Sequence, residues 1–405
     1  MSVFRRYGEV LRPPGARTAV VAGLVGRVSL GMTGLALLLV VKEATGSYGS
    51  AGLVAASYAV AVAVGAPLRA RTADRKGPAP VLVRTAVVHP MAFVALIALT
   101  HWHAPVVFDV VAGFLIGVTV PPLSSVLRAL WGRVLEPALL PVAYSLEAVL
   151  VEICFVTGPL LVALVAAVWA PAAALAASAV CASAGALLMA VVPVVRRTTP
   201  HPDRPTHLAG PLVSPLVRAC LLCVLCVGLG FGAIEVGVLA FVEEHGRDRA
   251  AAGVVLAVWS AGSALGGLVY GGLRLRSDAS RQLPVLVVLV GVAAALPLLA
   301  PSVLVLALLL AVAGSTIAPW SAANSVLLGR GAPAGTVTEA FAWNGSMIFG
   351  GAAVGNALAG ALADAHGAAG AFAVAAGGGA CVVLASLMGL RALHRGTIDP
   401  AHVAF

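Results

Sequence analysis

Four ionisable residues lie deep inside apolar stretches of this chain, where a charge is costly and usually serves a function. Arg27 lies in the first stretch and Glu235 in the seventh, while Glu147 and Glu152 share the fifth. A carboxyl group in such a place can carry a proton or hold a cation, and a guanidinium group can hold an anion or neutralise a carboxylate. These residue types indicate proton exchange or ligand binding within a membrane.

Arg27 and Glu152 lie at comparable depth in their two helices, so we expect them to form a pair. Such a pair suits a proton-coupling site, and the alternative is a static ion pair that fixes the register of the helices. Glu147 lies five residues before Glu152, about 140° around a helix at 3.6 residues per turn. We therefore expect Glu147 to face elsewhere, near the cytoplasmic entrance.

Two more acidic residues complete the candidate proton-coupling or substrate cavity. Glu235 has no obvious partner on its own helix, which indicates a substrate or proton site. Asp109 lies near the outer end of the fourth stretch. His89 precedes Pro90 in a supporting helix, and we assign it to packing.

Other chemistry is not supported by the residue pattern. Cys220, Cys223 and Cys226 have no His or carboxylate at ligand spacing, so they read as small buried hydrophobes rather than metal ligands. All six Cys lie in apolar stretches, which argues against a disulfide framework. The sequence has no Gly-rich phosphate loop ending in Lys-Ser/Thr, no nucleophile–base set and no metal cluster. We expect neither an enzyme nor a cofactor.

The elements that must position these residues are membrane-spanning helices. Hydrophobic residues make up 60% of the chain and charged residues 10%, against about 25% charged in soluble proteins. Each of twelve apolar segments approaches the ~20 residues that cross a bilayer. We expect an all-α integral membrane protein with spans at 18–41, 49–68, 79–100, 105–127, 141–169, 171–195, 216–242, 250–273, 283–300, 302–328, 335–363 and 369–391.

The second half of the chain repeats the first. Tyr58 is matched by Trp259, 201 residues later, and Pro80-Val81-Leu82-Val83 returns as Pro284-Val285-Leu286-Val287. Ala143-Tyr144-Ser145-Leu146-Glu147 faces Ala340-Phe341-Ala342-Trp343-Asn344. Two similar halves of an apolar chain indicate a duplicated membrane bundle. We expect six-helix bundles at 1–195 and 216–405, joined by a polar cytoplasmic linker at 196–215.

The basic residues orient this bundle. Most of the 25 Lys and Arg residues fall on one side of the predicted spans, and the other side has Lys42, Arg247 and Arg249. The positive-inside rule then places both termini in the cytoplasm. This topology also accounts for the net charge of +9 without nucleic acid. The abundance of Arg and Ala points to a bacterium, hence to its inner membrane.

The loop after the second span reads Ala70-Arg71-Thr72-Ala73-Asp74-Arg75-Lys76-Gly77. In this position the loop resembles the signature of the major facilitator superfamily, with Asp74, Arg75 and Gly77 matching and Ala70 replacing the leading Gly. The resemblance implies a twelve-helix transporter in which this loop is a latch. Its Asp contacts a helix end in the opposite half, so the resemblance assigns the latch to Asp74, supported by Arg75.

A second element of that family is partial. Gly158-Pro159 in span five resembles a motif of the family's proton-coupled drug antiporters, although the Gly pair that should follow is replaced by Leu160-Leu161-Val162-Ala163. The motif supports export, and the alternative is a helix kink that permits close packing.

The hypothesis from the sequence is a secondary transporter that exports a small apolar or amphipathic molecule in exchange for protons. It acts as a monomer among membrane lipids, with a small-molecule substrate as its partner. An uptake permease for a polar nutrient and a non-transporting sensor or scaffold of the same fold remain as alternatives.

Overall fold

The computed structural model of the protein describes residues 3–200, 209–247, 249–273 and 278–394. Eleven apolar helices among them are long enough to cross a membrane, and the last, Val337–Leu387, is long enough for two spans. The twelve predicted spans therefore correspond to these eleven segments, because the last segment holds spans eleven and twelve. Part of the predicted linker, at 201–208, lies outside the described residues, as do Arg204, Arg274, Arg276 and Arg395.

The N-terminal half holds the first six spans, and its fourth span is broken. A short helix α1 (Val3–Val10), which the sequence did not predict, precedes them. The remaining elements are α2 (Ala16–Thr45), α3 (Tyr48–Lys76), α4 (Pro78–His101), α5 (Val106–Thr119), α6 (Leu123–Val134), η1 (Pro137–Leu139), α7 (Leu140–Val168), α8 (Pro171–Val191) and α9 (Pro193–Arg197).

The C-terminal half repeats this plan. Its elements are η2 (Gly210–Val213), α10 (Pro215–Glu244), α11 (Arg249–Gly272), α12 (Ala279–Ala293), η3 (Leu296–Leu299), α13 (Val303–Gly314), α14 (Ile317–Gly331) and α15 (Val337–His394). Within α15, Gly367 adopts φ 67° and ψ −161°, outside the helical region. A left-handed φ of this kind favours glycine. The chain turns back there, and both arms of α15 pack on α10.

Spans four and ten are both interrupted near mid-membrane. Pro121 and Pro122 separate α5 from α6, because proline cannot donate a helical hydrogen bond. Ser315 and Thr316 separate α13 from α14. Broken helices leave backbone groups without helical partners, and such breaks in membrane transporters line cavities or are covered by protein.

Each half has a close helix contact at equivalent positions of the repeat. A side chain at Gly117 would meet the backbone carbonyl of Tyr58, and one at the equivalent Gly314 would meet that of Trp259. The internal duplication read from the sequence is therefore also a duplication of packing.

Large apolar side chains remain exposed on the outer faces of many helices, including Leu53, Val60, Leu164 and Leu299. A soluble protein rarely exposes apolar patches beyond a few hundred Å². The exposed surface therefore agrees with a bundle that uses lipid as its solvent.

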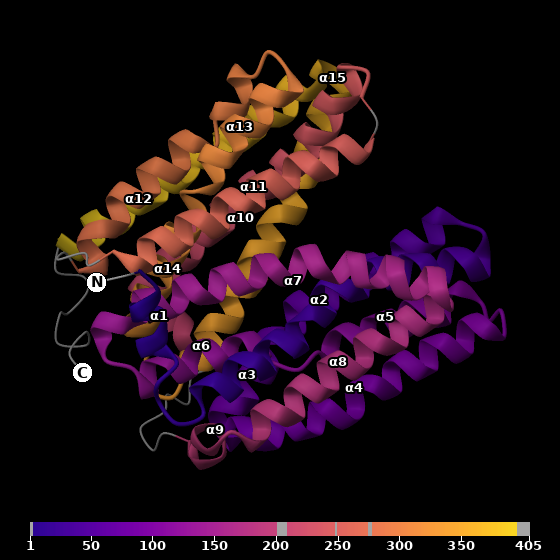
Figure 1. Ribbon diagram of the computed structural model, residues 1–405, viewed down its shortest axis with the longest axis horizontal. Helices are drawn as coiled ribbons and strands as arrows, with labels where there is room; N and C mark the ends of the chain where they lie inside the picture. The colour runs from indigo at the N-terminus through magenta and orange to yellow at the C-terminus, as the bar shows by residue number, and fades with distance from the viewer. Residues whose placement is uncertain (1–2, 201–208, 248, 274–277, 395–405) are drawn as a thin grey trace.

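The two halves converge at one end of the molecule and spread apart toward the other (Figure 1). We call the converging end, which carries Arg6, Arg71, Arg133 and Arg330, the arginine-rich end, and the opposite end, which carries Lys42 and Arg247, the arginine-poor end. At the converging end α3 packs on α15 and α7 packs on α11.

Candidate functional site

The deepest charged pair is Arg27 on α2 with Glu147 on α7. Arg27 Nη2 donates to Glu147 Oε2 at 2.5 Å, and both side chains are buried. Trp131 Nε1 of α6 donates to the other carboxylate oxygen at 3.3 Å. The predicted Arg27–Glu152 pair is wrong, as is a place for Glu147 at an entrance. The face of α7 turned toward α2 carries Glu147.

Positive charge exceeds negative charge around Glu147. Arg128 on α6 is a second guanidinium close enough to interact with this carboxylate. Arg27 Nε and Nη1 are buried and have no hydrogen-bond partner in the described part of the chain. Burying an ion pair in a low dielectric costs free energy, which the attraction between the partners must offset. Removing either partner leaves an uncompensated buried charge and should be strongly destabilising.

Glu152 instead faces the opposite half of the molecule. Its half-buried carboxyl group lies near Ser260 and Ser263 of α11. The contact is loose, because Ser263 Oγ is buried without a partner within hydrogen-bond geometry among the described residues. No Lys or Arg of the described segments forms an ion pair with Glu152. This carboxyl group therefore sits where α7 meets α11 across the two halves.

Glu235 is exposed on α10, and its neighbour is Asn356 on α15. Both residues belong to the C-terminal half, on the arginine-poor side of the Gly228–Ile348 helix contact. The structure thus does not bring Glu235 together with Glu152 into one cluster. Two separate carboxyl groups are available, one at the contact between halves and one within a single half.

Asp109 lies apart from both. It is buried in the first turn of α5, with Oδ1 unpartnered among the described residues. A carboxylate in the first turn of a helix is stabilised by the helix dipole. His89 is likewise buried, with Nδ1 3.0 Å from Thr119 Oγ1. That contact agrees with the packing role expected for His89.

The segment at 70–76, which the sequence predicted to be a loop, forms the last turns of α3 and reaches the other half of the molecule. Asp74 Oδ2 accepts a hydrogen bond of 2.9 Å from the backbone N–H of Glu339, in the first turn of α15. A carboxylate at this position satisfies an unpaired donor and complements the helix dipole. Gly77 ends this segment at φ 86°, and a side chain there would press on the Thr198 carbonyl.

The arginine that joins this contact is Arg71 rather than Arg75. Arg71 Nε lies 3.0 Å from both oxygens of Glu339, and its Nη2 lies 2.5 Å from Oε1. Arg75 is exposed. Arg71 lies three residues before Asp74, on the same face of the helix. That spacing was the signal in the sequence that could have identified Arg71.

Gly158 permits a close helix crossing within the N-terminal half. A side chain there would lie 2.6 Å from the Gly31 carbonyl carbon, so α7 and α2 touch through their backbones. Pro159 follows inside the same continuous helix. The equivalent pair in the other half, Gly355 and Gly232, also faces neighbouring backbone. Close packing therefore accounts for Gly158.

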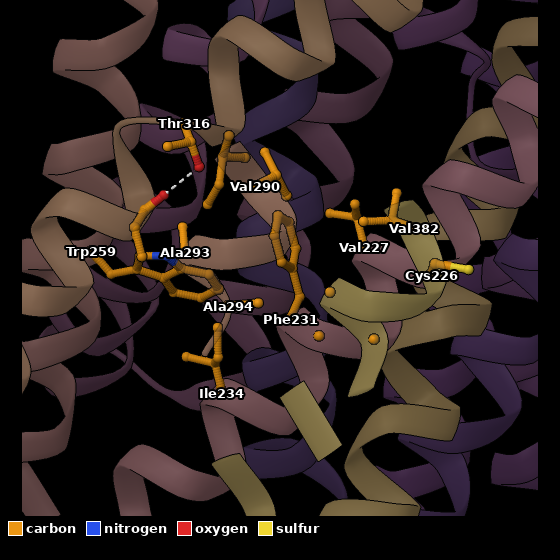
Figure 2. A pocket seen from close by; sticks show the side chains of 15 residues that line it. Cys226, Val227, Phe231, Ile234, Trp259, Val290, Ala293, Ala294, Thr316 and Val382 are labelled. Carbon is orange, nitrogen blue, oxygen red and sulfur yellow. Dashed lines mark hydrogen bonds between the residues drawn. The ribbon is translucent and has the colours of Figure 1, made fainter. Parts of the chain in front are cut away.

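An apolar cavity lies within the C-terminal half (Figure 2). Phe231 and Trp259 form its wall with ring centroids 5.2 Å apart, and Thr316 turns its hydroxyl to the Ala313 carbonyl at 2.8 Å. Its volume is about 30 Å³. Since a buried water needs roughly 10–15 Å³ on this measure, the cavity has room for about two waters and not for a drug-sized ligand. Among the described residues, no three His, Cys, Asp or Glu side chains are grouped to hold a metal ion.

A duplicated bundle of membrane-spanning helices with broken spans and a charged interior defines a multi-pass membrane transporter. The sequence pattern of the Major Facilitator Superfamily matches residues 19–236 and 220–402, and the chain belongs to this family. It is a transporter and not an enzyme.

Solved structures share its fold at low sequence identity. A bacterial homologue of the iron transporter ferroportin, solved in an outward-facing state, is 12% identical with a TM-score of 0.76, covering 93% of this chain and 98% of that one. The human organic anion transporter MFSD10 is 18% identical, with a TM-score of 0.71 and coverage of 92% and 100%. The Escherichia coli fucose:proton symporter FucP is 13% identical, with a TM-score of 0.69 and coverage of 93% and 98%. No curated protein matches the chain in sequence.

Proposed function

We propose that the protein works by alternating access and couples the export of a small apolar or amphipathic molecule to proton movement. The observation that carries this proposal is the position of Glu152. Its carboxyl group lies near serines of the opposite half and has no cationic partner in the described segments. It can therefore exchange a proton without breaking an ion pair, and the motion of the halves would change its surroundings.

The moving bodies are the two bundles, residues 1–195 and 216–405, with 196–215 as the linker. The positive-inside rule supports a cytoplasmic location for the arginine-rich end and for both termini, in a bacterial inner membrane. With Asp74 and Arg71 engaged on α15, this conformation is closed toward the cytoplasm. The likeness to a ferroportin homologue solved in an outward-facing state supports the same assignment. Asp74 is then the latch that must be released for inward opening.

The apolar substrate is supported by the residues near the contact between halves. Tyr144 and Phe341 meet there and present aromatic rings. Glu235, exposed beside Asn356, is the second candidate for proton or substrate binding.

The test is proton flux in proteoliposomes that hold purified full-length protein, screened against cationic and neutral amphipathic dyes. Glu152→Gln and Glu235→Gln are compared with wild type, and Glu43→Gln is the matched control. Glu43 is an exposed carboxylate at the arginine-poor end of α2.

We expect substrate-driven proton flux in wild type and in Glu43→Gln, and its loss in Glu152→Gln. Retention of full flux in both Glu152→Gln and Glu235→Gln contradicts the coupling assignment. Protons and substrate moving in the same direction would indicate an uptake permease instead. Movement of neither would favour a sensor of the same fold.

A further inference from the structure

The short N-terminal helix α1 bridges the two halves at the arginine-rich end (Figure 1). Arg6 Nη1 donates to the Gly271 carbonyl at 3.3 Å and also to the Leu273 carbonyl at the end of α11. Arg6 Nη2 donates to the Ala138 carbonyl at 3.1 Å, in the turn just before α7. One guanidinium group thus holds the C-terminal half and the N-terminal half together.

Tyr7 adds hydrogen bonds between α1 and α11. Its hydroxyl group lies 3.1 Å from the carbonyls of both Gly267 and Leu268, and its ring is buried. A side chain at Gly271 would collide with this hydroxyl, so the glycine makes room for it. Burial raises the pKa of Tyr7 to about 12, with Arg6 acting in the opposite direction, so the phenol remains a donor at physiological pH.

The physical basis of this contact mirrors that of the Asp74 latch. A helix ends with unpaired carbonyl groups and partial negative charge, which a cation complements. Arg6 meets the C-terminal end of α11, whereas Asp74 meets the N-terminal end of α15. The two contacts use opposite charges at opposite helix ends.

The internal repeat relates the places of these two contacts. The end of α11 is equivalent to the end of α3, and the start of α7 at Leu140 is equivalent to the start of α15 at Val337. The last turns of α3 contact the start of α15, and α1 joins the equivalent end of α11 to the turn before α7. Nearby, Asp278 caps α12 and binds Arg330 at 2.7 Å, within its own half.

A cavity of about 440 Å³ lies at this end between η1 and the start of α7 on one side and α11, α12 and α14 on the other. Beside the cavity α7 and α11 pack directly on each other, since a side chain at Gly271 would meet Ser145 as well as Tyr7, and the hydrogen bonds of α1 add to this contact. We propose that α1 is a second cytoplasmic latch, which holds the end of α11 against the start of α7. The proposal rests on alternating access as the mode of transport.

The test is hydrogen–deuterium exchange of the full-length protein in nanodiscs, which needs no substrate. Arg6→Ala/Tyr7→Phe is compared with wild type, and Asp74→Asn serves as the reference for a released latch. Arg5→Ala is the matched control on α1, because Arg5 is exposed and pairs only with Glu9 of the same helix in the described chain, at 3.4 Å.

A latch and a local cap give different exchange patterns. If α1 is a latch, its loss should open the whole arginine-rich end, with about tenfold faster exchange at the ends of α7 and α11 and also at the distant α3–α15 contact. Faster exchange confined to the last turn of α11, with the α3–α15 contact unchanged, overturns the proposal. Unchanged exchange near mid-membrane in α4 and α8 shows that the variant is folded.

The Asp74→Asn reference separates this proposal from the transport mechanism. If Asp74→Asn opens both the α3–α15 and the α7–α11 contact and the α1 variant opens neither, the second latch is wrong and alternating access stands. If Asp74→Asn also leaves both contacts protected, the gating proposal for this end fails, and the second latch fails with it.

Discussion

Tyr144 on α7 and Phe341 on α15, which occupy equivalent positions in the two halves of the repeat, contact each other with ring centroids 5.6 Å apart. Two residues related by a pseudo-two-fold axis can meet only close to that axis. The hydroxyl of Tyr144 also donates to the Arg128 carbonyl at 3.3 Å. The aromatic pair therefore lies where the two halves touch. Rocking of the halves must either keep this contact or break it.

Phe341→Ala should loosen this closure. Phe341 is buried, and truncation of a buried Phe to Ala typically costs about 3–5 kcal/mol. Here the substitution lowers the stability of the closed conformation. Amide exchange in the first turns of α7 and α15 should rise in nanodiscs. Tyr144→Phe keeps the ring and is the control with a small effect. Equal protection in wild type and Phe341→Ala would show that the pair does not close this end.

The Arg27–Glu147 pair should behave as a buried ion pair. Glu147→Gln leaves Arg27 without its carboxylate, which we expect to cost about 3–5 kcal/mol in unfolding free energy. Arg27→Met/Glu147→Met should recover most of that loss, because the uncompensated charge is gone. Thermal unfolding in detergent measures both variants.

Glu152→Gln is the control for this pair, since no ion pair is lost there and little stability should change. A double variant that is no more stable than Glu147→Gln alone contradicts the assignment of the pair.

Gly31 and Gly34 offer a matched test of the helix crossing. A side chain at Gly31 would lie 2.5 Å from the Cys154 carbonyl oxygen, whereas one at Gly34 would meet nothing within 4 Å. Gly31→Ala should destabilise the fold by about 1–3 kcal/mol through overpacking. Gly34→Ala should be neutral or stabilise by about 0.5–1 kcal/mol through helix propensity. Thermal unfolding in detergent compares them, and equal effects at the two sites would count against a backbone contact.

The Asp278–Arg330 pair predicts a pH effect on stability. Partial burial raises the pKa of Asp278, but the hydrogen bonds from Arg330 and Ser280 outweigh it and hold the pKa below its usual value. The stabilisation is then present above the unfolded pKa of about 3.9 and is lost as the pH falls through the lower folded value.

Asp278→Asn keeps the helix cap and removes the charge, so it should cost about 1 kcal/mol or less at pH 7, because the pair is partly exposed. The difference in melting temperature from wild type should shrink as the pH falls below the unfolded pKa of about 3.9. A difference that persists or grows on acidification contradicts this reading.

Hydrophobic length predicted the twelve spans, and the recurrence of residues such as Tyr58 and Trp259 predicted the duplication, because both patterns can be read along the chain. The sequence could not predict the partner of Arg27, because Glu147 and Glu152 differ in both depth and rotation about α7, and the face that α7 turns toward α2 depends on packing. The Pro121-Pro122 pair was a sign of the break in span four, and the gap predicted at 364–368 contains Gly367, whereas no proline lies at the break in span ten. The roles of α1 and Arg71 depend on contacts between halves, which no local pattern records.

The central claim is that the two halves rock about the contact near Tyr144 and Phe341, with Asp74 holding the arginine-rich end closed. The most direct test is pulsed electron spin resonance with label pairs across the halves, in a functional background whose six native Cys are replaced. Arg133 and Ala334 report on the arginine-rich end, and Glu43 and Arg247 report on the arginine-poor end. All four side chains are exposed.

In Asp74→Asn, the account predicts that the first label pair moves apart while the second pair moves together. Distances that match wild type at both ends, or that lengthen at both ends together, would contradict it.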